Sequence, residues 1–145
     1  MGTLVDDCDF CAIVAGDASA RIVHRDADTL AFFPLKPAVL GHTLVIPTTH
    51  VPDLYELPPE LAGPLLATLH RGALALRAAL TPEGLNLINS NGRVATQTVF
   101  HLHFHLVPRW SNDHIGNIWP PSEPWPDTEK DEVADLVRGA WEGLA

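Results

Sequence analysis

The segment HLHFHLVP, residues 101–108, places three histidines at alternate positions. Successive side chains of a β-strand point to opposite faces of the sheet, so we expect His101, His103 and His105 to form a row on one face. Neighbours in such a row stand about 6.6–6.8 Å apart at the backbone, and their rings can converge on one metal ion or one anion. A strand face that only contacts water is more commonly built from Thr, Ser, Lys or Glu. The segment therefore predicts a metal site, a catalytic site, or both.

Two cysteines bear on the choice among three interpretations of this row. The first interpretation is a catalytic metal site made of all three histidines. The second is a nucleophilic histidine assisted by the other two. In the third, one ring has a structural role and the other two are catalytic. Cys8 and Cys11 form a Cys-x-x-Cys pair, and structural zinc often takes two cysteines and two histidines. No thioredoxin-like βαβ pattern surrounds the pair, which disfavours a redox role. The remaining alternative is that both thiols pack as small apolar groups.

The composition favours one cytoplasmic domain. The chain has 145 residues, 46% of them hydrophobic, and a formal net charge of −9. This length supports one hydrophobic core, and an acidic surface attracts neither nucleic acid polymers nor anionic lipids. The apolar runs are far shorter than a membrane span, and the N-terminal residues lack the pattern of a signal peptide. We therefore expect no membrane or nucleic-acid partner, and any phosphate ligand must be bound by local groups.

Hydrophobic periodicity and turn residues predict an α+β fold. Residues 59–80 carry apolar positions at helical spacing, and prolines stand where such a helix begins. Shorter strand-like runs are separated by turn residues, which favours an antiparallel sheet over a parallel one. The expected strands are 20–26, 29–35, 41–47, 84–90 and 98–108, the last closed by Pro108, and a short helix is expected at 10–16.

The C-terminal part of the chain has a different pattern. Residues 110–127 are rich in Pro and Trp and show little periodicity, and an irregular stretch of this length is often functional. Thr128 and Asp131 resemble a capping box. They predict a final helix over residues 128–144, with an apolar stripe along it.

Three stretches of the chain resemble the histidine triad (HIT) superfamily of nucleotide-binding proteins. They are CDFCAIVAGDASARIVHRDADTLAFF at residues 8–33, GHTLVIPTTH at 41–50 and NSNGRVATQTVFHLHFHLVPR at 89–109. The resemblance implies a single HIT-like domain over residues 1–145, with its core in residues 8–109. It also implies an antiparallel half-barrel sheet of about five strands with two main helices, and usually a homodimer.

The resemblance further implies cleavage of a nucleotide at its α-phosphate. The family's nucleophile is the middle histidine of the triad, which here is His103. It would form a nucleotidyl-histidine, from which water or another acceptor releases the nucleoside monophosphate. The other residues implied in catalysis are His105, His42 and Thr98. Those implied in substrate binding are Gln97 and Ser90 near the phosphates, and Phe10, Ile13, Phe32 and Leu35 around the base and sugar, where core packing is the alternative.

A structural zinc ion is also implied by the resemblance. In zinc-carrying bacterial members, an N-terminal Cys-x-x-Cys joins a histidine after the Leu-Val-Ile-Pro strand and the first triad histidine. The matching positions here are Cys8, Cys11, His50 and His101. They would tie the N-terminal segment to the catalytic strand through a closed Cys₂His₂ site.

Two positions depart from the family pattern and keep other functions open. Thr96 stands where the family usually has glycine before the phosphate-site glutamine, and Pro34 stands where it has a ribose-contacting Asp or Asn. The leading hypothesis is a hydrolase or transferase acting on a purine nucleotide, with dinucleoside polyphosphates and nucleoside phosphoramidates as candidate substrates. The alternatives are a metal-dependent hydrolase that uses all three strand histidines, and a non-catalytic nucleotide-binding or sensing protein.

Overall fold

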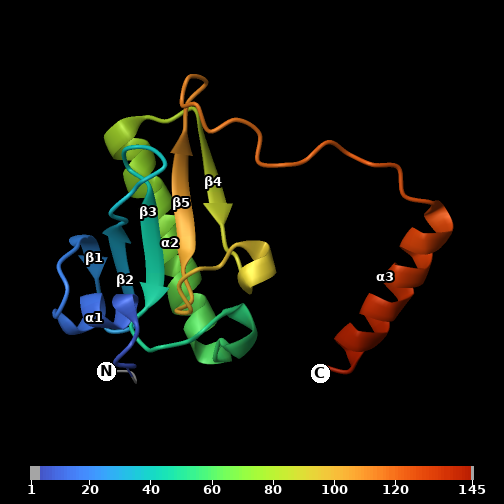
Figure 1. Ribbon diagram of the computed structural model, residues 1–145, viewed down its shortest axis with the longest axis horizontal. Coiled ribbons are helices and arrows are strands. Elements are labelled where there is room, and N and C mark those ends of the chain that lie inside the picture. Colours follow the sequence, from blue (N-terminus) through green and yellow to red (C-terminus); the bar gives the residue numbers. More distant parts are fainter. Residues whose placement is uncertain (1–3, 145) are drawn as a thin grey trace. The chain divides into compact units, whose positions relative to one another are not determined.

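The computed structural model describes residues 4–144, which form two compact units. The first unit ends at His114 and the second begins at Ile115 (Figure 1). The helices of the first unit are α1 (Asp9–Ala15) and α2 (Pro59–Leu80), with the 3-10 helices η1 (Leu54–Glu56) and η2 (Arg93–Ala95). Its strands are β1 (Arg21–Arg25), β2 (Thr29–Phe33), β3 (Thr43–Pro47), β4 (Gly84–Ile88) and β5 (Phe104–Arg109).

The five strands form one antiparallel sheet in the order β1-β2-β3-β5-β4. A tight turn links β1 to β2, whereas the chain leaves β3 through α2 and returns as the edge strand β4. Strand β5, which carries the last histidine of the row, His105, then lies between β3 and the edge strand β4 (Figure 1). The predicted α+β fold with a five-stranded antiparallel sheet is confirmed.

The two faces of the sheet have separate cores. Helix α2 covers one face, where a cluster of buried apolar residues includes Ala31, Val45, Leu65, Leu69 and Leu106. Helix α2 approaches the sheet closely because Gly72 has no side chain, and a Cβ there would lie 2.8 Å from Leu106 Cδ1. The other face carries the buried cluster Val14, Leu30, Phe32, Leu44 and Ile46, against which α1 packs. Because side chains alternate along β5, His105 lies on the α1 face, opposite Leu106, and the rings of His101 and His103 contact Phe10 of α1.

Strand β5 is shorter at its start than the sequence predicts. It begins at Phe104 rather than at residue 98, so His101 and His103 precede the β-ladder. Pro108 lies inside the strand, opposite Leu85, instead of closing it. The pairing of β5 with β3 ends at Leu106, so Pro108 sits where β5 has only one strand neighbour, and a missing N–H is tolerated there.

The second unit contains helix α3 (Asp127–Glu142). The predicted capping box at Thr128 is wrong: the helix begins at Asp127, its N-cap is Pro126, and no side chain among the described residues caps it. Proline before a helix sets an extended entry to the first turn without needing a cap bond, which explains the earlier start. Between residues 4 and 144, no helix has both the length and the apolar character needed to span a bilayer.

Candidate functional site

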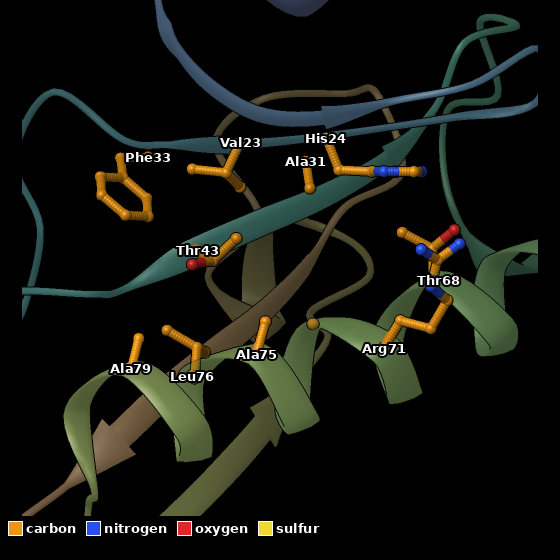
Figure 2. Close-up of a pocket in the computed structure, with 11 residues that line it drawn as sticks. Val23, His24, Ala31, Phe33, Thr43, Thr68, Arg71, Ala75, Leu76 and Ala79 are labelled. Atoms are coloured by element: carbon orange, nitrogen blue, oxygen red, sulfur yellow. The ribbon is translucent and has the colours of Figure 1, made fainter.

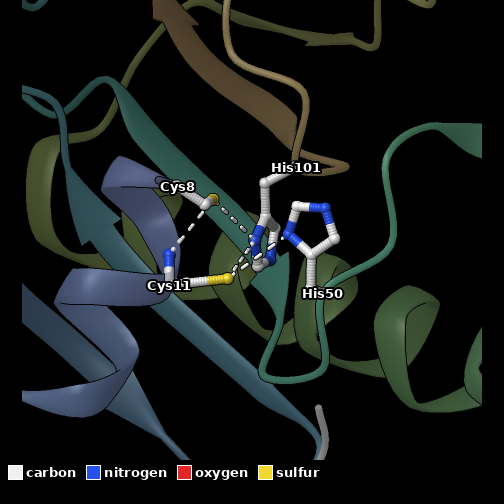
Figure 3. A group of neighbouring side chains, drawn as sticks. All are labelled: Cys8, Cys11, His50 and His101. Carbon is white, nitrogen blue, oxygen red and sulfur yellow. Dashed lines mark hydrogen bonds between the residues drawn. The ribbon is translucent and has the colours of Figure 1, made fainter. Parts of the chain in front are cut away.

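Four side chains with metal-binding atoms converge beside the start of the histidine row. Cys8, Cys11, His50 and His101 each place one such atom within 4.8 Å of the others (Figure 3). Cys8 Sγ lies 3.4 Å from His101 Nδ1, and Cys11 Sγ lies 3.3 Å from His50 Nδ1 and 3.5 Å from His101 Nδ1. A sulfur and a nitrogen bound to one tetrahedral zinc ion stand about 3.5 Å apart. The four residues therefore have the atoms and the spacing to bind a metal ion.

Local hydrogen bonds orient these side chains without a bound metal ion. Cys8 is the N-cap of α1, and its sulfur accepts a hydrogen bond from the backbone N–H of Cys11 at 3.3 Å, so both thiols leave the same turn. The ring of His101 donates from Nε2 to the carbonyl oxygen of Pro47 at 2.9 Å, which leaves Nδ1 to face the sulfurs. A ring held by such a carbonyl is the usual arrangement behind a metal-binding histidine.

Burial shifts the pKa of two of these residues, His101 and Cys11. Burial lowers the pKa of His101 to about 4, so its ring is neutral at pH 7, as a metal ligand requires. Burial also raises the pKa of the Cys11 thiol. The positive charge of a bound cation would therefore have to favour the Cys11 thiolate.

His103 is not part of this cluster and has a defined tautomer. Its Nδ1 lies 2.8 Å from the carbonyl oxygen of His101. A carbonyl can only accept, so Nδ1 carries the proton and Nε2 keeps a lone pair. The rings of Phe10 and His103 pack in a T-shaped arrangement, with centroids 5.3 Å apart. Burial lowers the pKa of His103 and is only partly opposed by the hydrogen bond to His101, which keeps the ring neutral and nucleophilic near pH 7.

His105 has the opposite arrangement of donor and acceptor, which a relay through His42 imposes. The backbone N–H of Ala38 donates to His42 Nδ1 at 3.0 Å, so His42 carries its proton on Nε2. That Nε2 lies 2.8 Å from His105 Nδ1 and donates to it, so a neutral His105 carries its proton on Nε2. Burial lowers the pKa of His42, and burial, followed by the electrostatic effect of the neighbouring His103 and His42 rings when they are protonated, lowers the pKa of His105 to about 4.

The three strand histidines do not share one site. The ring of His101 joins the cysteines, while the rings of His103 and His105 lie side by side with centroids 5.1 Å apart. Among residues 4–144, the Cys₂His₂ group is the only His, Cys or carboxylate cluster with metal-binding spacing. The alternative in which all three rings bind a single catalytic metal is therefore not supported, because the ring of His101 belongs to the Cys₂His₂ group and those of His103 and His105 do not.

Gln97 and its neighbours lie on the loop before the triad. Gln97 is buried, and its amide bonds to three backbone groups: it accepts from Gly92 N–H at 2.8 Å and donates to the carbonyls of Pro52 at 2.8 Å and Val99 at 3.0 Å. In this structure Gln97 thus holds the loop in shape. Thr98 is exposed and lines a shallow depression with Cys8 and His50, and Ser90 is half-buried just after β4.

The four residues expected around the base and sugar occupy different places. Phe10 and Ile13 are half-buried on α1 and pack against the core cluster of that face. Phe32 belongs to this cluster and is only 2% exposed, whereas Leu35 is 87% exposed. The structure brings Phe10 into contact with His103 and with Phe32, which is part of the core, while Leu35 stands in the loop after β2.

The HIT domain family model matches residues 15–112. The chain belongs to the HIT family. It is 42% identical over 115 residues to Protein hit of Bacillus subtilis, covering 79% of each chain. It is 36% identical over 135 residues to adenosine 5′-monophosphoramidase hnt1 of Schizosaccharomyces pombe, covering 90% of this chain and 98% of that protein. Relatives in the family thus include a protein named as a nucleotide hydrolase.

Solved structures of HIT proteins agree with this fold. The crystal structure of a Streptococcus mutans protein superposes with a TM-score of 0.89 at 41% identity, covering 97% of this chain and 88% of that one. A zinc-bound histidine triad family protein from Mycobacterium smegmatis superposes with a TM-score of 0.72 at 39% identity, covering 95% of each chain. A metal-bound HIT protein is therefore among the structures that this chain resembles.

The departure from the HIT pattern at Thr96 has a visible structural consequence. Thr96 adopts a left-handed conformation with φ of 72° as the C-cap of η2. That region costs a non-glycine residue about 1–2 kcal/mol, and a β-branched residue is especially unsuited to it. The backbone at Thr96 has the conformation that glycine would favour, so the threonine adds strain to the loop.

Sequence reasoning missed two residues of the site, Asn89 and Asn91. The Nδ2 of Asn89 donates to the carbonyl oxygen of His103 at 2.9 Å, and the Nδ2 of Asn91 donates to Asn89 Oδ1 at 2.6 Å. The available signal was the Asn-x-Asn-Gly stretch directly after β4, but the same residues are equally typical of a plain turn.

A separate cavity of about 350 Å³ opens between β1, β2, β3 and α2 (Figure 2). Ala31 and Thr43 form its sheet side, while Ala75 and Leu76 come from the helix. Since Ala31 pairs with Val45 and Val45 with Phe104, this cavity lies on the α2 face of the sheet, opposite the triad. It is therefore not the place where His103 would meet a substrate.

Proposed function

We propose that this protein is a nucleotide hydrolase or transferase that cleaves at the α-phosphate of adenosine nucleotides through His103. The observation that carries the proposal is the pairing of two neighbouring neutral rings with complementary nitrogens. His103 offers a lone pair on Nε2, and His105 offers a proton on Nε2. A nucleophile beside a hydrogen-bond donor suits attack on a phosphoryl group, whose oxygens gain negative charge as the reaction proceeds.

In the first step, His103 Nε2 attacks the α-phosphorus and forms the P–N bond. The bond from phosphorus to the leaving group breaks, and the leaving group takes the electron pair and is protonated from solvent. The His103 ring then carries a positive charge, and the His101 carbonyl that already accepts from Nδ1 stabilises it. In the second step, water attacks the phosphorus and releases one proton to solvent, the electron pair of the breaking P–N bond returns to His103 Nε2, and the nucleoside monophosphate leaves.

The remaining site residues support this reaction. His42 holds His105 in the tautomer that donates to the phosphate. We assign Thr98 to the leaving-group side, Gln97 and Ser90 to the phosphate-side loop, and Phe10, Ile13, Phe32 and Leu35 to the nucleoside side. For Gln97 the supporting contacts are those to the backbone, so its role in the proposal is to hold the loop that faces the phosphate.

The metal of the Cys₂His₂ group is proposed to be zinc, in a structural role. Four protein ligands leave no open coordination position, so a zinc ion there would supply a closed cross-link between α1 and the histidine segment. Its supporting observations are the donor set, the S–N spacing and the zinc-bound HIT relative. The free thiols of Cys8 and Cys11 fit a reducing compartment, and we propose the cytoplasm.

The proposed substrates are adenosine phosphoramidates and dinucleoside polyphosphates. The relative named as an adenosine 5′-monophosphoramidase supports the first class. Both classes present an adenosine α-phosphate with a leaving group opposite the attacking nitrogen. We also propose that the working form is a homodimer that binds a purine nucleotide in each chain.

The test compares wild type with His103→Ala for turnover of adenosine 5′-phosphoramidate and of a dinucleoside polyphosphate, alongside nucleotide binding by calorimetry. We expect turnover to fall by roughly 10³-fold or more while AMP binding and the melting temperature are retained. His24→Ala is the matched control, since His24 is a half-buried histidine paired with Asp26 on the edge strand β1. Undiminished turnover in His103→Ala would exclude His103 as the nucleophile. Nucleotide binding without turnover in the wild type would favour the alternative of a non-catalytic sensing protein.

A further inference from the structure

The backbone of His103 lies where the sheet has ended. Strand β4 stops at Ile88, which pairs with His105, and β5 begins only at Phe104. Strand β4 therefore ends short of the carbonyl oxygen of His103. The side chain of Asn89, the first residue after β4, takes the place of a strand neighbour and donates to this oxygen at 2.9 Å. A side-chain amide thus extends the hydrogen bonding of the sheet by one position, at the nucleophile.

A second asparagine fixes the direction of this contact. The backbone N–H of Leu54, in η1, donates to Asn91 Oδ1 at 2.7 Å, so the NH₂ group of Asn91 must face the other way. There it donates to Asn89 Oδ1 at 2.6 Å, which in turn leaves Asn89 with its NH₂ group toward His103. One backbone donor therefore sets the orientation of both amides.

We propose that Asn89, oriented by Asn91, is a positioning residue for the nucleophile His103, an inference that rests on the proposed function. The ring of His103 is fixed from one side by the His101 carbonyl, and the His103 backbone is fixed from the other side by Asn89. With both contacts made, Nε2 keeps one position relative to the Nε2–H of His105. An error of about 1 Å in such a position can cost about 10²-fold in rate.

Three variants separate positioning from plain stabilisation of the loop. Asn89→Asp keeps the size and the acceptor for Asn91 but removes the donor, and Asn89→Ala removes both. Asn91→Ala leaves Asn89 in place but frees its amide to turn. The matched control is Asn86→Ala, because Asn86 lies on β4 and its Oδ1 accepts from Arg109 Nη1 at 2.8 Å, far along β5 from His103.

We expect kcat for adenosine 5′-phosphoramidate to fall about 10- to 100-fold in Asn89→Asp and Asn89→Ala, with KM changed less than about threefold. Asn91→Ala should lose less activity than either, and Asn86→Ala should keep the wild-type kcat. The melting temperatures of the Asn89 variants should fall no further than that of Asn86→Ala. An unchanged kcat in Asn89→Asp, or equal losses in the Asn86→Ala control, would overturn the inference.

A readout without substrate keeps this inference separate from the proposed function. Nitrogen-proton NMR of the histidine rings should show one sharp Nδ1–H tautomer for His103 in wild type and Asn86→Ala. In Asn89→Asp the same ring should broaden or split, since its backbone is no longer held. A sharp, unchanged NMR signal from the His103 ring in Asn89→Asp would refute positioning even if the protein proved to be inactive. Absence of turnover in the wild type would refute only the proposed function.

Discussion

His101 and His103 are two residues apart on one extended segment, yet they occupy different chemical settings. His101 is fully buried, donates from Nε2 to a carbonyl and turns Nδ1 toward two thiols. His103 donates from Nδ1 to a carbonyl, so its Nε2 keeps the lone pair. In our proposal an imidazole acts as a metal ligand or as a nucleophile according to which of its nitrogens donates to a backbone carbonyl. The backbone partner, rather than the residue type, then assigns the role.

The largest expected effect comes from removing a ligand on the His101 side. Cys11→Ser should weaken metal binding and lower the free energy of unfolding by at least about 3 kcal/mol, because metal affinity that depends on the fold contributes directly to stability. Thermal denaturation with and without added zinc measures this. Ser19→Ala, an exposed change outside the cluster, is the control. A variant that melts like wild type at all zinc concentrations would show that no metal stabilises the fold.

Changing His42 tests the His103 side, where a relay of hydrogen bonds sets the tautomer of the neighbouring ring. His42→Ala removes the donor to His105 Nδ1, so His105 can place its proton on either nitrogen. We expect kcat to fall about 10- to 100-fold, less than for loss of a group that transfers the proton itself, because His42 acts only through His105. His42→Gln, whose amide can donate to the same nitrogen, should recover part of the loss. Equal kcat values for the alanine variant and wild type would contradict the relay.

The pH dependence of stability probes the buried histidines in a different way. The pKa of His105 is lowered to about 4, so between about pH 6.5 and pH 4 the unfolded chain binds a proton at this position that the folded chain does not. The free energy of unfolding should therefore decline as pH falls through that interval, and it should decline less in His105→Gln. Urea titrations at about pH 7, 5.5 and 4.5 measure the difference. If the free energy of unfolding declined equally with pH in wild type and His105→Gln, the lowered pKa of His105 would be excluded.

The smallest expected effect concerns the strained loop on the catalytic side. Thr96→Gly relieves a left-handed conformation, which should raise the free energy of unfolding by about 0.5–1 kcal/mol after the entropy cost of glycine is subtracted. Denaturant unfolding detects a change of this size. Thr81→Gly is a matched control, because Thr81 also has a positive φ of 48° but lies at the end of α2, away from the triad. If Thr96→Gly were destabilised and Thr81→Gly were not, the Thr96 side chain would contribute to the stability of the loop.

Most regular elements could be predicted from local patterns in the sequence, and the metal group could be predicted from the resemblance to the family. Helix α2 matches the predicted residues 59–80, since a long apolar stripe behind Pro59 leaves few alternatives. Four separated ligand residues could be grouped because their family spacing is distinctive, and the structure brings them together. The course of a segment was therefore predictable wherever periodicity or a motif constrained it.

Contacts between loops could not be predicted in the same way. The bonds of Gln97 to the backbone of Pro52 and Val99, and of Asn89 to His103, depend on how two irregular segments cross. No hydrophobic period specifies such a crossing. The start of β5 at Phe104 is of the same kind, because it depends on where the neighbouring strands end and not on the strand's own residues.

A single experiment can test whether His101 binds metal while His103 attacks the nucleotide, as we propose. Intact-protein mass spectrometry after brief mixing with adenosine 5′-phosphoramidate, followed by peptide mapping, locates any adduct, and native spray of the same sample records bound zinc. We predict an AMP-sized adduct on His103 in protein that still carries one zinc ion per chain. An adduct on His101, or zinc loss that stops turnover at once in a chain that remains folded, would contradict this division of roles.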